Sequence, residues 1–216
     1  MKTFISLGVF FFALSFCNLA ERFTGKSDTN SATNSTQTNT SSDTSKTTSS
    51  GDGMAEKYTL SPAQANILKN AKEIKWDEQG MSWTLPPGWK KTTSSPTTFM
   101  CSSPQGTFLI VNVSPMSAEF SNDVSIKANY DGSVTRQKNG ELEKLRYLEL
   151  DGVRGVEFLE TEYQGKDSPR RHQWLGFRQY AGQNQMLNIM LSTKGASFDK
   201  HRDIFAAAMS STKITR

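Results

Sequence analysis

The chain of 216 residues is poor in cysteine and histidine, with two residues of each. If Cys17 is acylated or removed, Cys101 has no partner in the chain, so a disulfide framework is not expected and a hydrophobic core must stabilise the fold. No segment places acids, bases, nucleophiles or metal ligands at a telling spacing. The sequence therefore predicts no catalytic, cofactor-binding or metal-binding residues.

Strong charge and long apolar runs are also lacking. The formal net charge is +4, and Lys90-Lys91 and Arg170-Arg171 are short pairs without interleaved aromatic residues, so no nucleic-acid partner is expected. The apolar run at residues 4–16 is shorter than the roughly 20 residues of a spanning helix, which makes a permanent membrane span the weaker interpretation.

What the N-terminus does contain is typical of export. Lys2 precedes the apolar run, so residues 1–20 are predicted to be a secretory signal peptide. Leu14-Ser15-Phe16-Cys17 is similar to the lipobox of bacterial lipoproteins, although a small residue is expected where Phe16 stands. We predict lipidation at Cys17. Ordinary cleavage near Ala20 and an uncleaved anchor are the alternatives.

A linker is predicted at residues 21–53. From residue 24 onward it consists almost wholly of Ser, Thr, Asn, Asp, Gly and Lys, which offer nearly no apolar surface to offset the entropy of ordering. About 30 flexible residues span on the order of 30 Å, enough to hold a domain clear of a membrane. The glycosylation sequons at Asn34 and Asn39 are explained by this composition.

Residues 54–79 are predicted to form a short docking helix and a connection. Ser61, Pro62 and Gln64 suit the N-cap, the first helical position and a capping box. The expected apolar stripe consists of Ala63, Ile67, Ala71 and Ile74.

Residues 80–216 are predicted to be one domain that begins with strands. Met81–Leu85, 97–102 and 106–113 have strand patterns, and the third is apolar on both faces, which predicts a central strand packed on each side. A helix is expected from Ser121 to about Thr135.

The second half of the domain predicts four strands and a final helix. Asp151-Gly152 is a hairpin turn between residues 145–150 and 153–163. Strands follow at 172–180 and 186–192, and the second has one core face and one half-polar face that something partly covers. With a helix from Ser197, the fold class is α+β, a single largely antiparallel sheet sandwiched between helices.

Several groups of residues are candidate sites. Cys101 with His172 or His201 lacks a local catalytic signature, so Cys101 is predicted to be a buried strand thiol. His201 lies at i+2 between Asp199 and Asp203, which directs it away from both on a helix and argues against a metal site.

Charged and aromatic residues on the strands have structural explanations. Cross-strand pairing on a solvated face is predicted for Glu157, Glu160, Glu162, Arg170, Arg171 and Arg178. Of the aromatic residues, Trp89 follows the turn Pro86-Pro87-Gly88 and is the candidate exposed contact residue.

These features together resemble a known family. The Cys-bearing export signal, the polar linker, Met81-Ser82-Trp83-Thr84-Leu85-Pro86, the Leu148-Glu149-Leu150-Asp151-Gly152 hairpin and the strands 174–180 and 186–192 are similar to the PsbP/Mog-type fold, and most of all to DcrB-like envelope lipoproteins. The resemblance covers about residues 80–215. It implies an accessory domain in an α/β/α sandwich, without a shared enzymatic activity or shared site residues.

Two function classes follow. A non-catalytic, exported and membrane-tethered domain that binds a partner protein predicts an exposed apolar or aromatic patch beside the sheet. A small-ligand carrier or weak hydrolase predicts a closed pocket with convergent polar groups and shifted pKa values. We favour the first, as a monomer without cofactors, anchored in the cell envelope and facing the periplasm or exterior; a secreted or periplasmic soluble protein is the alternative.

Overall fold

The computed structural model of the chain describes residues 54–162 and 164–216. The predicted signal peptide, Cys17 and the predicted linker lie outside the described residues. The elements, in chain order, are β1 (Glu56–Lys57), α1 (Pro62–Leu68), β2 (Lys72–Trp76), a 3₁₀ turn (Asp77–Gln79), β3 (Met81–Leu85), β4 (Lys90–Ser94), β5 (Thr98–Ser102), β6 (Phe108–Met116), α2 (Asn122–Lys138), β7 (Leu142–Leu150), β8 (Val153–Glu160), β9 (Pro169–Tyr180), β10 (Gln183–Lys194), α3 (Gly195–Ser210) and β11 (Lys213–Ile214).

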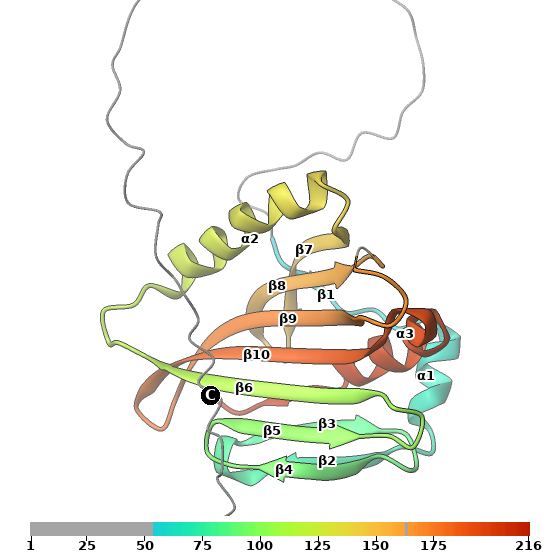
Figure 1. Cartoon of the computed structure of the whole chain (residues 1–216). Coiled ribbons are helices and arrows are strands. Elements are labelled where there is room, and N and C mark those ends of the chain that lie inside the picture. Colours follow the sequence, from blue (N-terminus) through green and yellow to red (C-terminus); the bar gives the residue numbers. More distant parts are fainter. Residues whose placement is uncertain (1–53, 163) are drawn as a thin grey trace, which may run out of the picture. The chain divides into compact units, whose positions relative to one another are not determined.

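Eight strands form one large sheet in the order β1-β7-β8-β9-β10-β6-β5-β4 (Figure 1). All neighbours are antiparallel except β1, which pairs parallel with Leu148 and Glu149 of β7. The predicted α+β class with one largely antiparallel sheet is confirmed. Four strands lie between α2 and α3, as predicted, but five rather than three separate α1 from α2.

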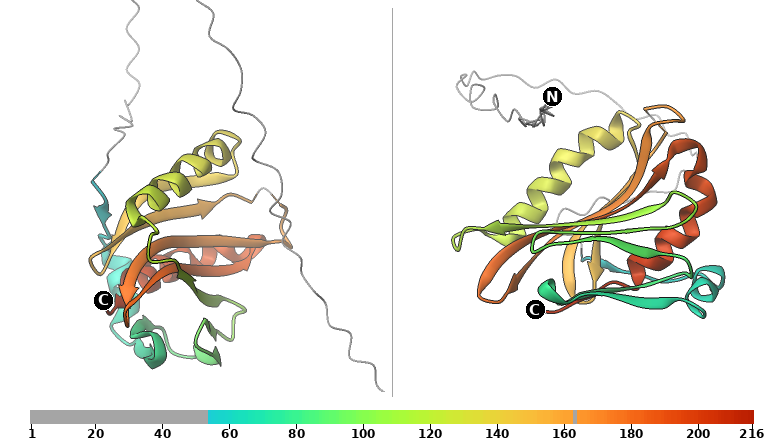
Figure 2. Two further views of the ribbon diagram at one scale, coloured as in Figure 1. Left: turned by 90° about the vertical axis from the view of Figure 1, so that its left-hand side faces the viewer. Right: turned by 60° about the horizontal axis from the view of Figure 1, so that its bottom comes forward.

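A second sheet of three strands, in the order β11-β3-β2, was not predicted. Met81–Leu85 belongs to this sheet and not to the large one. The small sheet and α3 lie on one face of the large sheet, and α2 lies on the other, so the domain that the structure describes has three layers (Figure 2). We call the face under α2 the outer face and the opposite one the core face.

The segment 54–79 is joined to the domain by two strand pairings. The capping box is present as predicted, with Ser61 N donating to Gln64 Oε1 and Gln64 N donating to Ser61 Oγ. The predicted stripe is wrong beyond Leu68, because α1 ends there and Ile74 lies in β2, paired with Trp83 of β3.

Two tight turns fix the register of the four strands that follow α2. Asp151 and Gly152 have φ angles of 48° and 80°, the geometry of a type I′ hairpin turn, which confirms the predicted hairpin between β7 and β8. Ala181 and Gly182 form a second such turn, with φ angles of 50° and 78°, between β9 and β10. Both turns match the twist of the flanking strands, so each hairpin continues without a break over most of its length.

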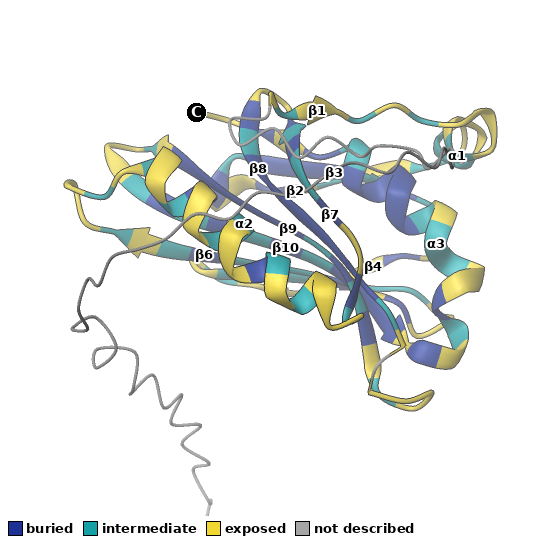
Figure 3. Ribbon diagram, turned by 90° about the horizontal axis from the view of Figure 1, so that it is seen from above, coloured by how far each residue is buried: buried dark blue, intermediate teal, exposed yellow. Residues whose placement is uncertain are grey.

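α2 covers only part of the outer face. Beneath it lies an apolar cluster whose buried members come from α2 and from strands β7, β8 and β9: Ile126, Leu142, Leu145, Val156, Phe158, Leu175 and Phe177. The opposite side of α2 is exposed (Figure 3). Strands β10, β6 and β5 lie beyond this cluster, and their outward side chains are less buried.

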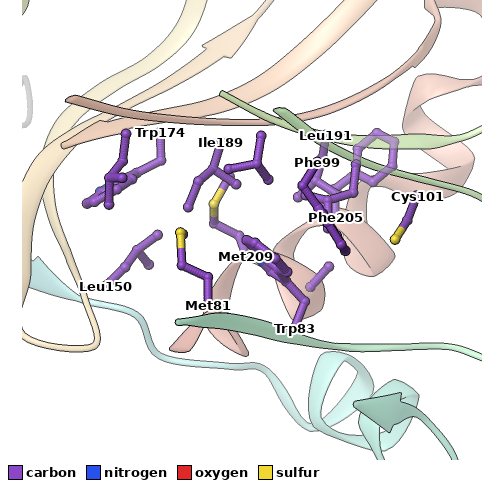
Figure 4. Close-up of a cluster of buried hydrophobic side chains, with 14 of the residues drawn as sticks. Met81, Trp83, Phe99, Cys101, Leu150, Trp174, Ile189, Leu191, Phe205 and Met209 are labelled. Atoms are coloured by element: carbon purple, nitrogen blue, oxygen red, sulfur yellow. The ribbon is translucent and has the colours of Figure 1, made fainter. Parts of the chain in front are cut away.

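The main core fills the space between the large sheet and the layer of α3, β2 and β3 (Figure 4). Phe99 is stacked between Trp76 and Trp83, with ring centroids 5.5 and 5.2 Å apart. Phe198, Phe205, Ala208 and Met209 of α3 are buried in this core. Cys101 is fully buried here, and burial raises the pKa of its thiol to about 11, so the thiol is protonated at neutral pH.

Trp89 also belongs to this core. Its side chain is only 9% exposed, so the prediction that it is an exposed contact residue is wrong. The reason is that Pro86-Pro87-Gly88 turns the chain from β3 into β4, an edge strand of exposed polar residues, and Trp89 points inward at the start of that strand.

Candidate docking groove and buried polar centre

A groove of about 1110 Å³ lies on the outer face where α2 no longer covers the sheet. Its apolar floor is made by Met100 of β5, Phe108 and Ile110 of β6 and Met190 of β10. We call this feature the outer groove. It also corrects a prediction: β6 is an interior strand of the sheet, but only its core face is fully packed, and Phe108 on the outer face is 39% exposed.

The strand register shows how coverage ends across the sheet. One row of outward side chains runs from β7 to β5 and consists of Leu145, Phe158, Gln173, Met190, Ile110 and Met100. Leu145 and Phe158, under α2, are buried, whereas the other four are half-buried. The half-polar face predicted for residues 186–192 is therefore the transition from the covered to the uncovered part of the outer face.

The rim of the outer groove is charged. Glu160 accepts hydrogen bonds from Arg171, with Nη1 3.2 Å from Oε1, and lies 3.5 Å from Arg136 Nη2. Lys194 and Asp167 are exposed and 4.0 Å apart. Glu160 itself is buried, so this end of the groove presents two guanidinium groups to solvent beside the exposed Lys194–Asp167 pair.

A second feature is a buried polar centre on the core face. Glu157 is fully buried and accepts hydrogen bonds from His172 Nε2 at 2.7 Å and from Arg146 Nε. Arg146 also pairs with Glu56 of β1, and its guanidinium lies 5.7 Å from the ring centroid of Tyr58. These five residues, which we call the polar centre, attach the first described segment of the chain to the large sheet.

Electrostatics hold Glu157 in its ionised form. Burial alone would raise its pKa, but the hydrogen bonds and charges of His172 and Arg146 outweigh burial and lower the pKa to about 2. Burial and the charge of Glu157 raise the pKa of Tyr58. Because a carboxylate only accepts hydrogen bonds, His172 Nε2 carries a proton and donates it to Glu157.

The polar centre borders a cavity of about 370 Å³ that is lined mainly by charged side chains from β1, β7 and α3. The described residues that line it include no serine or cysteine beside His172. Cys101 lies in the main core and His201 packs near Phe205, with ring centroids 6.2 Å apart, so neither takes part in this centre.

A further group of charged residues joins β7, β9 and α3. Arg170 bonds Glu143 and Asp199 at 2.9 and 3.1 Å, and Arg202 bonds the same two acids. Asp203 accepts a hydrogen bond from Gln64 of α1. The acids that flank His201 therefore have separate partners, and no group of three His, Cys, Asp or Glu side chains suited to a metal occurs within 54–162 and 164–216.

The prediction that the charge pairs of β8 and β9 lie on a solvated face is wrong. Glu157, Glu160, Arg170 and Arg178 are all buried. The pairing of Glu160 with Arg171 across β8 and β9 is confirmed. Arg178 differs from the others because its hydrogen-bond partners, Gln79, Gln185 and the Thr215 carbonyl, are neutral, and burial lowers its pKa to about 10.

The polar centre predicts a specific pH dependence. A carboxylate whose pKa falls from 4.5 to about 2 on folding contributes about 3 kcal/mol, present above pH 4.5 and lost as the pH falls towards 2. Glu157→Gln should therefore be less stable than wild type by about that amount at pH 7, and the difference should shrink towards zero near pH 2, as measured by urea unfolding.

Glu149→Gln is the matched control for this measurement. Glu149 lies on the neighbouring strand and pairs with Lys57 at 3.8 Å, but Lys57 is largely exposed, so removal of this pair should cost less than 1 kcal/mol at every pH. A Glu157→Gln difference that did not change between pH 5 and pH 2 would contradict the assignment of an ionised Glu157.

Comparisons with known proteins show likeness of structure. No family model matches the chain, and no curated protein sequence matches it. The structure of LpqN, described as involved in cell envelope biogenesis of Mycobacterium tuberculosis, matches with a TM-score of 0.50 and 11% identity over 68% of this chain and 86% of LpqN. This likeness shows a shared fold.

Two other solved structures match less well. Cyanobacterial PsbP (CyanoP) from Synechocystis sp. PCC 6803 has a TM-score of 0.44 and 15% identity over 78% of this chain and 98% of its own. A Bacteroides thetaiotaomicron protein has a TM-score of 0.44 and 9% identity over 68% of this chain, and this chain spans about half of it, 49%. The α+β architecture that the PsbP/Mog-type resemblance implied is the one observed, and the narrower likeness to DcrB-like lipoproteins stays a prediction.

Proposed function

We propose that this chain is a non-catalytic, exported accessory domain of the cell envelope that binds a partner protein through the outer groove. The observation that carries the proposal is the apolar floor of the groove, which lies open beside a helix that buries the rest of the same sheet face. Exposed apolar patches with a polar rim are typical of protein interaction sites. LpqN, which shares the fold, is described as involved in cell envelope biogenesis, which supports the same compartment.

The alternative is a small-ligand carrier or weak hydrolase. The observation in its favour is His172, oriented by an ionised Glu157 at the wall of a polar cavity. The hydrogen bonds of this centre, however, all run between residues of the domain: His172 and Arg146 bond Glu157, and Arg146 also bonds Glu56, which joins β1 to β7. A structural role for the polar centre explains these contacts, so we favour partner binding.

Site-specific photo-crosslinking in intact cells tests partner binding. A benzophenone side chain at Phe108, inside the groove, should give a discrete crosslinked product, and Met190→Glu in the same chain should reduce that product at least tenfold because it places a charge in the apolar floor. Val124 on α2 is the control position, because it is a 68% exposed apolar side chain away from the groove lining. Products that are identical at both positions, or that survive Met190→Glu, would contradict the proposal.

Membrane attachment through Cys17 is a separate prediction. No helix among residues 54–162 and 164–216 is long and apolar enough to cross a membrane. Two or more acyl chains anchor a protein stably, each buried methylene contributing about 0.8 kcal/mol, whereas one chain binds reversibly. The wild-type protein should stay in the membrane fraction through a salt wash, and Cys17→Ser should release it or leave an unprocessed precursor. A soluble wild-type protein that begins near Glu21 would exclude the anchor.

A further inference from the structure

We infer that the occupant of the outer groove is an amphipathic α-helix of the partner protein, with an apolar stripe and acidic residues at the end that meets Arg136, Arg171 and Lys194. This inference rests on the proposed function and specifies its partner. It follows from four features of the groove: the pairing of its strands, its width, its floor and its rim.

The strands of the floor offer no free backbone edge. β10 lies between β9 and β6, β6 between β10 and β5, and β5 between β6 and β4. Each strand bonds a neighbour on both sides, so an extended peptide cannot add to the sheet here by main-chain hydrogen bonds. An occupant must satisfy its own backbone and bind through side chains, which is what a helix does.

The uncovered width fits one helix. In the row that crosses the sheet, the half-buried side chains extend from Gln173 to Met100 over four strands. At about 4.8 Å between neighbouring strands this distance is roughly 14 Å, and a helix with its side chains is about 10–12 Å wide. α2 already packs on the same face over β7, β8 and β9, so a second helix beside it would complete the outer layer.

The floor suits a packed apolar stripe of limited length. Met100, Phe108, Ile110 and Met190 form its apolar part, and two of the four are methionines, whose flexible side chains adapt to a partner surface. Farther along the same strands the outward residues become polar, with Thr98 bonded to Asn112 and Gln173 to Asn188. Phe108 and Ile110 are about 7 Å apart along β6, so the apolar contact spans one to two turns of a helix, and polar contacts are expected beyond it.

The rim sets the charge of the occupant. Of the charged residues that line this end, Arg136, Arg171 and Lys194 are cations and Glu160 and Asp167 are acids, of which Glu160 is buried. Arg136 also bonds Glu141, which is not part of the groove lining, with Nε 3.1 Å from Oε2. Lys194 is 72% exposed and lies just before α3. Acidic residues at this end of a bound helix gain favourable interactions, and basic residues are repelled.

The test uses synthetic 16-residue amphipathic peptides with one apolar stripe and a fluorescent label. One peptide ends in two glutamates, a second ends in two lysines, and a third has the stripe scrambled. Binding to the full chain carrying Cys17→Ser, which removes any attached lipid, is measured by fluorescence anisotropy. We expect the acidic peptide to bind at least tenfold more tightly than the basic one, and the scrambled peptide not to bind.

Variants of the chain locate the binding. Met190→Ser should weaken binding of the acidic peptide at least tenfold. Met116→Ser, on the same sheet face but outside the groove lining, should leave this affinity unchanged. Lys194→Glu should reduce or reverse the preference for the acidic peptide, and Lys72→Glu on β2 is its charge-matched control. Equal binding of the acidic and basic peptides, or no effect of Met190→Ser, would overturn the helix assignment.

Two outcomes separate this inference from the proposed function. If the crosslink at Phe108 depends on Met190 but no helical peptide binds, a partner docks in the groove and the helix assignment is wrong. If the crosslink to a protein is absent and the benzophenone at position 108 instead crosslinks to lipid in vesicles of anionic phospholipid, the groove takes an amphiphilic lipid. Both the inference and partner docking then fail.

Discussion

Val111→Asp should abolish the cooperative unfolding transition of the domain. Val111 lies on the core face of β6, is fully buried, and is paired with Ile189 and Phe99 on the neighbouring strands. An aspartate there would be an unpaired charge in an apolar core, at a cost of about 5 kcal/mol or more, comparable to the whole stability of a typical domain of about 5–15 kcal/mol. Thermal circular dichroism and the soluble fraction measure the result.

Ile110→Asp is the matched control for this experiment. Ile110 is the next residue on the same strand, and it points to the outer groove, where it is half-buried. An aspartate there keeps contact with water, so the variant should unfold cooperatively with a loss below about 2 kcal/mol and should lose the groove-dependent crosslink. A Val111→Asp protein that melts like Ile110→Asp would contradict the position of β6 between the core and the groove.

The hairpins show how much of the fold the sequence could predict. The Asp151-Gly152 pair fixes a two-residue turn, and counting outward from it places Arg146 opposite Glu157. The pairing of Arg146 with Glu157 could therefore be predicted from the turn. Their burial could not, because charged side chains are rarely buried. What made burial acceptable is a third residue, His172, from another strand.

The second sheet could not be predicted in the same way. β3 has a strand pattern, but β2 falls in the segment predicted to be a helix and connection, and β11 is only two residues long. No turn of fixed geometry specifies that β3 pairs with β11 near the C-terminus rather than with the large sheet. β4 was missed because its residues, from Lys90 to Ser94, are all exposed and polar at a sheet edge. Pairings between segments distant in sequence depend on the packed core, which local patterns do not describe.

The groove is the clearest case of a site that the sequence could only outline. The alternation of apolar and polar residues in β10 predicted that its outer face is partly covered. Which strands are covered depends on where α2 lies across the sheet. Residues 108–113 carry apolar side chains on both faces. This pattern fits a buried central strand, and it fits equally a strand with one solvent-exposed apolar face that binds a partner. Only the exposure of Phe108 distinguishes the two.

Gly176→Ala should destabilise the domain by about 3–5 kcal/mol, although the residue gains only a methyl group. Gly176 pairs with Gly155 on β8, and the indole of Trp174 covers both glycines on the core face. A Cβ atom at Gly176 would lie 2.5 Å from Trp174 Cζ2, and one at Gly155 would lie 2.5 Å from Trp174 Cε2. Trp174 is fully buried and donates a hydrogen bond from Nε1 to the Leu148 carbonyl at 3.0 Å, so displacing the ring adds the loss of a buried bond to the cost of overpacking.

Gly132→Ala provides the matched control, because a Cβ atom at this position of α2 has no neighbour within 4 Å and alanine favours a helix by up to about 1 kcal/mol. Urea unfolding should show opposite signs for the two variants, and the emission of Gly176→Ala should shift to longer wavelength if the indole is displaced. In a double-mutant cycle, Gly176→Ala should cost less when Trp174 is replaced by leucine, since the clash is then removed. If the two changes were additive, the strain would not lie between Gly176 and the indole, and the packing described for this pair of glycines would be wrong.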